Sequence, residues 1–175
     1  NPEQPELGTR KMPFSKYLYI EREDFKEEAN RKFFRLTLGK EVRLKNAYII
    51  KGESVVKDES GNITEILCTY DPKSKSGSGT EESQRKVKGT LHWVSTKEAL
   101  PVNVRLYDRL FKEESPDQDK SVDFKIHLNP NSLSTLNGFS EPSLLNVEPG
   151  DLFQFQRLGY FIVDPDSTSK KLIFN

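Results

Sequence analysis

The sequence predicts a mainly β fold, built as two consecutive small β-barrels with one or two short helices. Short runs rich in β-branched and aromatic residues recur along the chain, and Pro, Asn and Gly separate them. The length of 175 residues fits one ordinary domain or two small ones. Hydrophobic residues make up only 34% of the chain, which suits small barrels with much surface for their interior.

The first half of the chain contains five candidate strands and one candidate helix. Residues 22–31 are expected to form a short helix with Asp24 near its start. Residues 58–63, with the sequence DESGNI, have the composition of a hairpin turn. Residues 71–84 are rich in Ser and Gly and are expected to form a mobile loop. The candidate strands are residues 17–21, 35–39, 41–50, 63–70 and 88–95.

The second half repeats this β pattern. A helical turn is expected at residues 106–111. Three further segments have the composition of strands, namely residues 123–128, 152–164 and 170–175.

The division between the two barrels is expected near Ala99. Residues 1–99 would form mainly the first barrel and residues 100–175 mainly the second, and an exchange of strands across this boundary is left open. The chain begins with Asn rather than Met and stops directly after a candidate strand. We therefore expect it to be a piece of a longer protein.

Positive charge is concentrated in one segment of a chain that has no net charge. The 27 basic and 27 acidic residues balance, yet between residues 31 and 51 seven residues are basic and only Glu41 is acidic. Hydrophobic residues alternate with Arg43 and Lys45, so both side chains should lie about 7 Å apart on one exposed strand face. Such a polarised surface can bind a polyanion despite the neutral total.

Motifs of several enzyme and metal-binding classes are absent from the sequence. It contains no P-loop, no dinucleotide-binding glycine motif and no Cys/His spacing for zinc. His92 and His127 lie in strand patterns, and we interpret both as structural. The single cysteine, Cys68, excludes an internal disulfide framework and fits a reducing cytosol. No apolar run approaches the ~20 residues that span a bilayer. We expect a cytoplasmic chain that binds no metal, has no cofactor of its own and does not associate with a membrane.

Basic and amide side chains occur close to aromatic ones. RNA-binding proteins stack unpaired bases on aromatic or guanidinium planes, read base edges with amide or guanidinium groups, and hold phosphates with lysines. This pattern favours RNA binding, and the alternative is that these are ordinary outward-facing strand residues. The basic and amide residues are Arg35, Arg43, Lys45, Arg85, Lys86, Lys88, Gln154 and Arg157; the aromatic residues are Phe33, Phe34, Tyr48, Phe153, Phe155 and Tyr160.

Longer stretches of the sequence resemble one family. The segments GTRKMPFSKYLYIEREDFKEEANRKFFRLTLGKEVRLKNAYIIKG, GNITEILCTYD, RKVKGTLHWVS, LPVNVRLYDRLF, GFSEPSL and FQFQRLGYF follow one another in order. They closely resemble the C-terminal anticodon-binding region of bacterial-type glutaminyl-tRNA synthetases. The segment RKVKGTLHWV is more similar to this branch than to the related eukaryotic glutamyl enzymes.

The resemblance implies both architecture and function. It implies two consecutive β-barrels, related to those of certain ribosomal proteins, that together grip the anticodon loop of the tRNA for glutamine. It further implies that an upstream domain, outside these residues, charges this tRNA with glutamine using ATP. The chain alone would then bind and discriminate without catalysing, as a monomer.

Five residues match anticodon contacts of this family. Arg43 and Lys45 match the pair at the first base. The family commonly has arginine at the second of these positions, and lysine lacks the planar guanidinium fork that makes bidentate contacts. We therefore assign Lys45 to a phosphate contact or a single hydrogen bond. Arg35 matches an arginine that reads the third base, a guanine, whose adjacent acceptors suit that fork. Gln154 and Arg157 match the pair at the central uridine, where the glutamine amide can donate to one uracil oxygen and accept from the imino group, an arrangement that cytosine would not satisfy.

Other residues are assigned less directly. Lys32 and Phe34 occupy neighbouring contact positions, and Phe34 stands where the family often has a basic residue. Arg85, Lys86 and Lys88 are candidate contacts to the RNA backbone.

There are two alternatives to anticodon recognition within a synthetase. One is a stand-alone β-barrel protein that binds structured RNA; it would start at a methionine just before Asn1 with no synthetase domain upstream. The other is an enzyme in its own right, which the absence of nucleotide and metal motifs disfavours.

Overall fold

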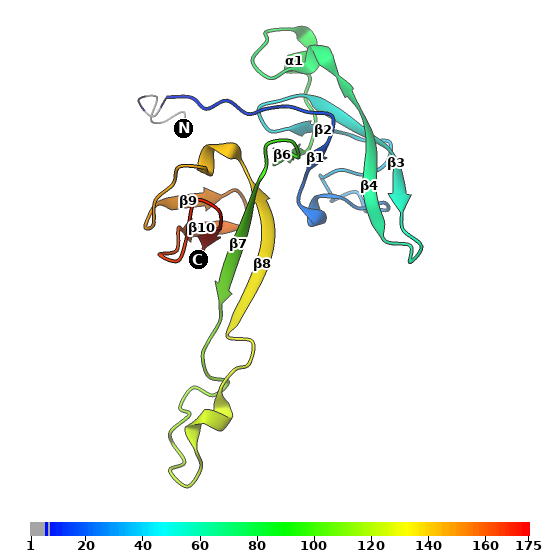
Figure 1. Cartoon of the computed structure of the whole chain (residues 1–175). Helices are drawn as coiled ribbons and strands as arrows, with labels where there is room; N and C mark the ends of the chain where they lie inside the picture. Colours follow the sequence, from blue (N-terminus) through cyan, green and yellow to red (C-terminus); the bar gives the residue numbers. More distant parts are fainter. Residues whose placement is uncertain (1–5, 7) are drawn as a thin grey trace. The chain divides into compact units, whose positions relative to one another are not determined.

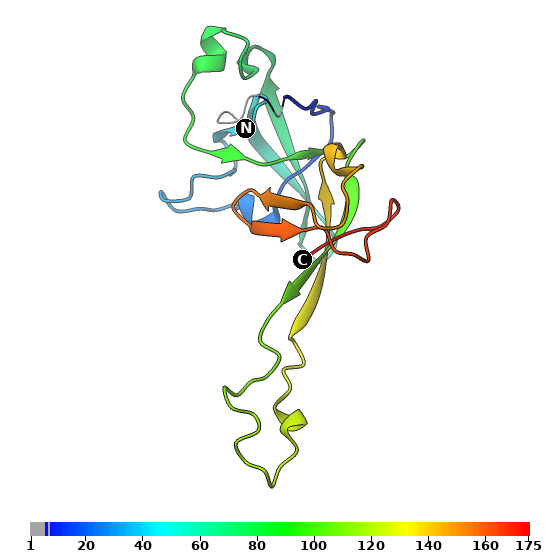
Figure 2. The same cartoon turned by 90° about the vertical axis from the view of Figure 1, so that its left-hand side faces the viewer.

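The computed structural model describes residue 6 and residues 8–175, and the chain divides into two compact units. One unit is Phe14–Thr96; the other combines the described residues up to Pro13 with Lys97–Asn175. Short strands in several sheets dominate, with few short helices, which confirms the prediction of a mainly β chain (Figures 1 and 2).

The unit Phe14–Thr96 contains a four-stranded sheet and a small two-stranded one. Its strands are β1 (Leu18–Tyr19), β2 (Glu41–Leu44), β3 (Ile49–Lys57), β4 (Ile63–Asp71), β5 (Thr90–Leu91) and β6 (Val94–Ser95). The larger sheet has the order β4-β3-β2-β5, in which only the β2–β5 pair is parallel, and β1 pairs with β6. Leu44 in β2, Ile49 in β3 and Leu91 in β5 are fully buried members of the larger sheet.

The hairpin turn expected at residues 58–63 is confirmed. Asp58 N–H donates to the Asn62 carbonyl at 2.9 Å, and Gly61 adopts a φ of 81° that favours glycine. The turn joins β3 to β4, and this pair shifts register between Gly52 and Ser54.

The single strand expected at residues 41–50 is wrong, because the chain reverses within it. β2 ends at Leu44, and Ala47 N–H donates back to the Leu44 carbonyl at 2.9 Å. Asn46 takes a φ of 58°, the left-handed conformation that asparagine tolerates better than most residues. Lys45 therefore lies at the start of a turn rather than within a strand.

The helix expected at residues 22–31 is also wrong beyond its first turn. Only a 3-10 turn, η2 (Arg22–Asp24), forms. Phe25 is buried and forms a parallel bridge with Leu36, and Lys26 N–H donates to the Leu36 carbonyl at 3.2 Å. Burial of Phe25 and pairing with a distant segment override the local helical preference.

The loop between β4 and β5 contains two short helices. They are η3 (Pro72–Ser74) and α1 (Glu81–Gln84). Thr80 caps α1 by accepting from Ser83 N–H. The mobility expected of this Ser/Gly loop stays a prediction.

The second unit is organised around one three-stranded sheet and one hairpin. The sheet has the order β11-β7-β8, from β7 (Leu100–Tyr107), β8 (Leu133–Ser140) and β11 (Leu172–Phe174), and β9 (Leu152–Phe155) pairs with β10 (Gly159–Ile162). Its buried core consists of Val102, Val163, Leu172 and Phe174.

The segment between β7 and β8 differs from the expectation. Residues 106 and 107 complete β7 instead of starting a helical turn, and residues 124–127 form a 3-10 helix, η4 (Phe124–His127), instead of a strand. Asp123 explains the latter, since its carboxylate accepts from Lys125 N–H. The segment extends beyond the ends of β7 and β8 in both views (Figures 1 and 2).

Candidate nucleic-acid interface

Phe34 and Lys88 form a contact on the surface of the unit Phe14–Thr96. The Phe34 side chain is 46% exposed, and Lys88 Nζ lies 5.6 Å from the centre of its ring. Gly89 makes this approach possible, because a Cβ at that position would lie 2.5 Å from the Phe34 carbonyl oxygen. An exposed ring beside a lysine is suited to a stacked base and its phosphate.

Arg35 is held by the fold on one side. Its Nε donates to the Asp24 carboxylate at 3.1 Å, and Nη1 donates to the Phe34 carbonyl at 3.2 Å. The Asp24 side chain is only 4% exposed, whereas that of Arg35 is 32% exposed. Arg35 therefore neutralises a buried carboxylate while part of its guanidinium stays at the surface.

The Arg43 side chain lies against the loop between β4 and β5. Its Nη1 donates to the Ser74 carbonyl at 3.0 Å and to Ser76 Oγ at 3.2 Å. Its Nη2 donates to the carbonyls of Ser83 at 2.9 Å and Arg85 at 3.1 Å. Sequence reasoning placed Arg43 on an exposed face; the side chain is half-buried, and four loop acceptors surround it.

Three more basic residues of the expected set, Lys45, Arg85 and Lys86, lie outside the strands of this unit. Lys45 is half-buried, and its backbone N–H donates to the Leu91 carbonyl at 2.9 Å. Arg85 makes ion pairs with Glu41 at 3.1 Å and Asp71 at 3.3 Å, so acidic neighbours balance much of its charge. Lys86 is exposed.

Lys32 lies in an irregular segment of the same unit. It is exposed, and its backbone N–H donates to the Asn30 side chain at 3.0 Å. The strand pattern gave no indication of this local turn.

Gln154 and Arg157 belong to the β9–β10 hairpin of the other unit. Gln154 is exposed and lies opposite Tyr160 in the ladder. Arg157 is exposed at the turn, where its φ of 70° is uncommon for a residue with a side chain. Leu158 N–H donates to the Phe155 carbonyl at 2.9 Å and closes this turn.

Few of the aromatic residues expected near RNA are exposed. Phe153 and Phe155 point into their unit and contact Phe174, with ring centres 6.2 and 5.1 Å apart. Phe34 and Tyr160 are the exposed members of the expected set within the described residues, and Tyr160 is 79% exposed. Strand alternation in FQFQRLGYF separates the inward Phe153 and Phe155 from the exposed Tyr160, a signal already present in the sequence.

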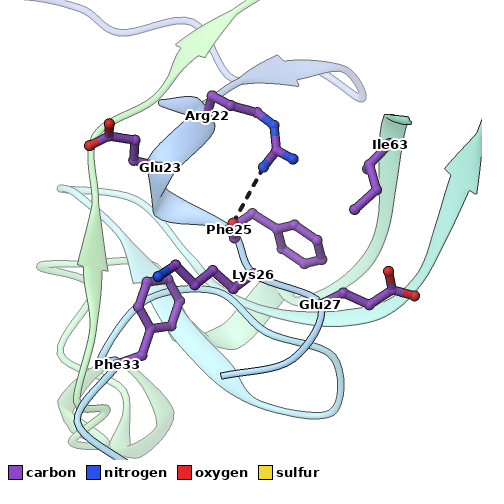
Figure 3. A pocket seen from close by; sticks show the side chains of 7 residues that line it. All are labelled: Arg22, Glu23, Phe25, Lys26, Glu27, Phe33 and Ile63. Atoms are coloured by element: carbon purple, nitrogen blue, oxygen red, sulfur yellow. Dashed lines mark hydrogen bonds between the residues drawn. The ribbon is translucent and has the colours of Figure 1, made fainter. Parts of the chain in front are cut away.

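A surface pocket of about 650 Å³ lies beside η2 and was not anticipated (Figure 3). Lys26 Nζ lies 5.1 Å from the centre of the Phe33 ring, and Arg22 donates to the Phe25 carbonyl at 3.4 Å. Two basic and two acidic side chains share the lining, so its charge favours neither anions nor cations. The lining residues are Arg22, Glu23, Phe25, Lys26, Glu27, Phe33 and Ile63.

Metal-ligand clusters and membrane-spanning helices are both absent from the described part of the chain. Among residue 6 and residues 8–175, no three His, Cys, Asp or Glu side chains come together as metal ligands. Within the same residues no helix is both long and apolar enough to cross a membrane.

Two models of one protein family match the chain. Both are described as "tRNA synthetases class I (E and Q), anti-codon binding domain", and they match residues 1–71 and 90–164. The chain belongs to this anticodon-binding family. Lys32, Phe34, Arg35, Arg43 and Lys45 fall within the first match. Gln154 and Arg157 fall within the second.

The residues between the two matches of this anticodon-binding chain are 72–89. They contain η3, α1 and the three candidate contacts to the RNA backbone, Arg85, Lys86 and Lys88.

Relatives of this anticodon-binding chain are longer proteins. The glutamine–tRNA ligase of Rhodopirellula baltica is 57% identical over 176 aligned positions, which cover 100% of this chain and 29% of the relative. Those of Vibrio parahaemolyticus and Proteus mirabilis are each 52% identical, over 100% of this chain and 31% of the relative. The chain thus spans about three-tenths of the length of these relatives.

Proposed function

We propose that this chain is the part of a glutamine–tRNA ligase that recognises the anticodon of the tRNA for glutamine. Identity of 57% over the whole chain to a ligase of that name carries the proposal. The two family matches and the exposed basic and aromatic side chains support it. Charging with glutamine and ATP belongs, on this proposal, to a catalytic domain upstream in the same polypeptide, and the chain itself binds without catalysing. The proposal also takes the protein to be a monomer and to be cytoplasmic.

The proposed contacts lie on both units. Phe34 and Lys88 would receive a base and its phosphate, and Arg35 would read the third base, a guanine, with the part of its guanidinium that faces solvent. Arg43 and Lys45 would serve the first base. The further residues assigned to the RNA are Lys32, Arg85 and Lys86.

The β9–β10 hairpin would take the central uridine. The Gln154 amide would donate to one uracil oxygen and accept from the imino group, while Arg157 contributes positive charge at the turn. Tyr160 lies opposite Gln154 in the ladder and is 79% exposed, so its ring offers a stacking surface next to the amide.

Titration of anticodon stem-loops that differ only in the central base tests this assignment. We expect tighter binding to the uridine stem-loop than to the cytidine one, because an amide held in the orientation that accepts from the uracil imino group would face an acceptor nitrogen in cytosine. Gln154→Ala should reduce that preference, whereas Gln118→Ala, on an exposed segment of the same unit, should leave it unchanged. Equal affinities of the unaltered chain for uridine and cytidine would contradict the proposal.

A further inference from the structure

The Arg43 guanidinium has a matching acceptor for every hydrogen on its two terminal nitrogens. Nη1 carries two hydrogens and donates to Ser74 O and Ser76 Oγ; Nη2 carries two and donates to Ser83 O and Arg85 O. All four donor–acceptor distances lie between 2.9 and 3.2 Å. A bidentate contact to a base edge would require these nitrogens to give up bonds that they already make.

These four acceptors come from the two ends of one loop. Ser74 and Ser76 lie at its start, where Ser74 is fully buried and its Oγ accepts from Ile49 N–H at 2.8 Å. Ser83 and Arg85 lie at its end, in and just after α1. Gly77 and Gly79, both at φ 79°, separate the two ends and give the loop little stiffness of its own. Arg43 therefore links the start of the loop to its end.

The end of this loop leads directly into the basic stretch at residues 85–88. Arg85 follows α1, and its guanidinium pairs with Glu41, two residues before Arg43 in β2. Backbone N–H of Arg43 donates to the Gly89 carbonyl at 2.8 Å, just after Lys88. One residue of β2 thus holds the stretch at both of its borders.

We propose that Arg43 acts as a positioning residue that fixes the loop of residues 74–85 and thereby places Arg85, Lys86 and Lys88 against the RNA backbone. This inference rests on the proposed function and deepens it, since Arg43 then serves the anticodon through the loop rather than through the edge of the first base. Its effect on affinity would be independent of which base occupies the first position.

The conservative variant Arg43→Lys tests this role. Lysine keeps the charge but has one nitrogen with three hydrogens, so it cannot span the four acceptors. We expect faster amide hydrogen exchange across residues 76–85 without RNA, and faster tryptic cleavage after Lys75. With RNA, the Kd should rise by about tenfold for every first base (about 1.4 kcal/mol). Arg22→Lys is the matched control, since Arg22 makes one 3.4 Å bond to Phe25 O and none to the loop.

A second variant addresses the loop side of the same contact. Ser76→Ala removes one acceptor of Arg43, and we expect the same two effects at smaller size. In the double variant these effects should be less than additive, because both substitutions remove one shared interaction.

Opposite outcomes would overturn the inference. Unchanged loop exchange in Arg43→Lys, with a loss confined to one first base, would make Arg43 a direct reader of that base. If Arg43→Lys changed neither the amide hydrogen exchange of the loop nor the affinity for the stem-loop, Arg43 would have no role in either. Failure of the unaltered chain to bind any stem-loop would instead refute the proposed function, while hydrogen exchange would still decide whether Arg43 fixes the loop.

Discussion

Arg35 pairs with a buried carboxylate and also exposes part of its guanidinium to solvent. Its substitution should therefore affect both stability and RNA recognition. Its ion pair with Asp24 joins two segments that are separated by ten residues in sequence, and both lie next to the bridge between Phe25 and Leu36. Sequence reasoning identified Arg35 as a site residue but placed Asp24 in a helix, so the pairing could not be foreseen.

Arg35→Gln should change both recognition and stability. We expect a loss of about 1–3 kcal/mol in discrimination at the third base, because the guanidinium fork to guanine is gone. The free energy of unfolding should fall by about 1–3 kcal/mol, since the buried Asp24 carboxylate loses its ion pair with Arg35. Urea unfolding and stem-loop titration measure the two effects separately. Arg22→Gln is the control, and a uniform affinity loss for all third bases would make Arg35 a phosphate contact.

At the scale of elements, the backbone of Gly89 packs so closely against the Phe34 carbonyl that residue 89 has no room for a side chain. Phe34 O lies 2.5 Å from where a Cβ of residue 89 would be, and as a backbone atom it cannot rotate away. The contact between the Phe34 ring and Lys88 thus depends on a residue without a side chain.

Gly89→Ala should destabilise the chain by about 1–3 kcal/mol, because the added methyl group overpacks a closed site. It should also weaken stem-loop binding through displacement of Phe34. Gly138→Ala is the matched control: its Cβ would meet Val102 at 3.8 Å, an ordinary contact, so a change within about 0.5 kcal/mol is expected. Urea unfolding of both variants gives the comparison, and equal losses would refute the overpacking explanation.

Asp164 joins several segments of the second unit at one carboxylate. Asp166 N–H donates to Oδ1 at 2.6 Å, and the Asn175 amide and Arg105 Nη1 donate to Oδ2 at 2.6 and 2.7 Å. These contacts favour the charged form, and the backbone donor from Asp166 contributes most, so the pKa of Asp164 lies below its ordinary value.

The resulting pH dependence has a definite sign. A lowered pKa means that the folded chain binds fewer protons than the unfolded one near pH 4, so this stabilisation is present above the ordinary aspartate pKa of about 3.9 and is lost as pH falls through the folded value. We expect Asp164→Asn to lower the free energy of unfolding at pH 7 and to flatten its decline below about pH 4. Urea unfolding across this range checks it against the exposed control Asp117→Asn; parallel profiles would contradict the expectation.

The elements differ in how well the sequence predicted them. The turn at Asp58 was predictable because its residues carry local turn chemistry, and the strand at residues 63–70 because β-branched residues recur in it. The turn after Leu44 was missed since alternation of hydrophobic residues continues up to Lys45, and Asn46 adopts its left-handed conformation without a following glycine. Residues 22–31 were mistaken for a helix because the partner of Phe25, Leu36, lies outside the local window.

The candidate site was predictable in its residues more than in its contacts. The similarity of motifs identified Arg43, and the basic residues of RKVKGTLHWVS included Arg85, but no pattern indicated that the Arg43 guanidinium binds the Arg85 carbonyl. Exposure of Tyr160 follows from strand alternation, whereas the half-burial of Lys45 depends on the turn that was missed.

For the whole molecule, balance between 27 basic and 27 acidic residues makes long-range attraction to RNA weak, so local contacts must carry the salt dependence. Arg85 has acidic neighbours within 3.3 Å, while Lys86 is exposed. Lys86 is therefore the stronger candidate for a phosphate contact at the end of the loop.

Stem-loop affinity should fall with salt, and Lys86→Gln should make the slope of log K against log salt shallower by about 0.7, the value for one single-strand phosphate contact. Base preferences should stay the same, because a phosphate contact carries no sequence information. Titrations at several salt concentrations test this against Lys97→Gln, an exposed control in the other unit. A changed base preference would show that Lys86 reads a base.

The unit Phe14–Thr96 interrupts the other one in sequence, and its own two ends meet. Leu18 lies opposite Ser95, and Thr96 N–H donates to the Tyr17 carbonyl at 3.1 Å. A segment whose two ends are hydrogen-bonded to each other in this way has the geometry of an inserted domain. Joining Pro13 to Lys97 by a short peptide linker would remove the entire insert. Evolution or protein engineering could exchange such an insert without changing the backbone path of the other unit.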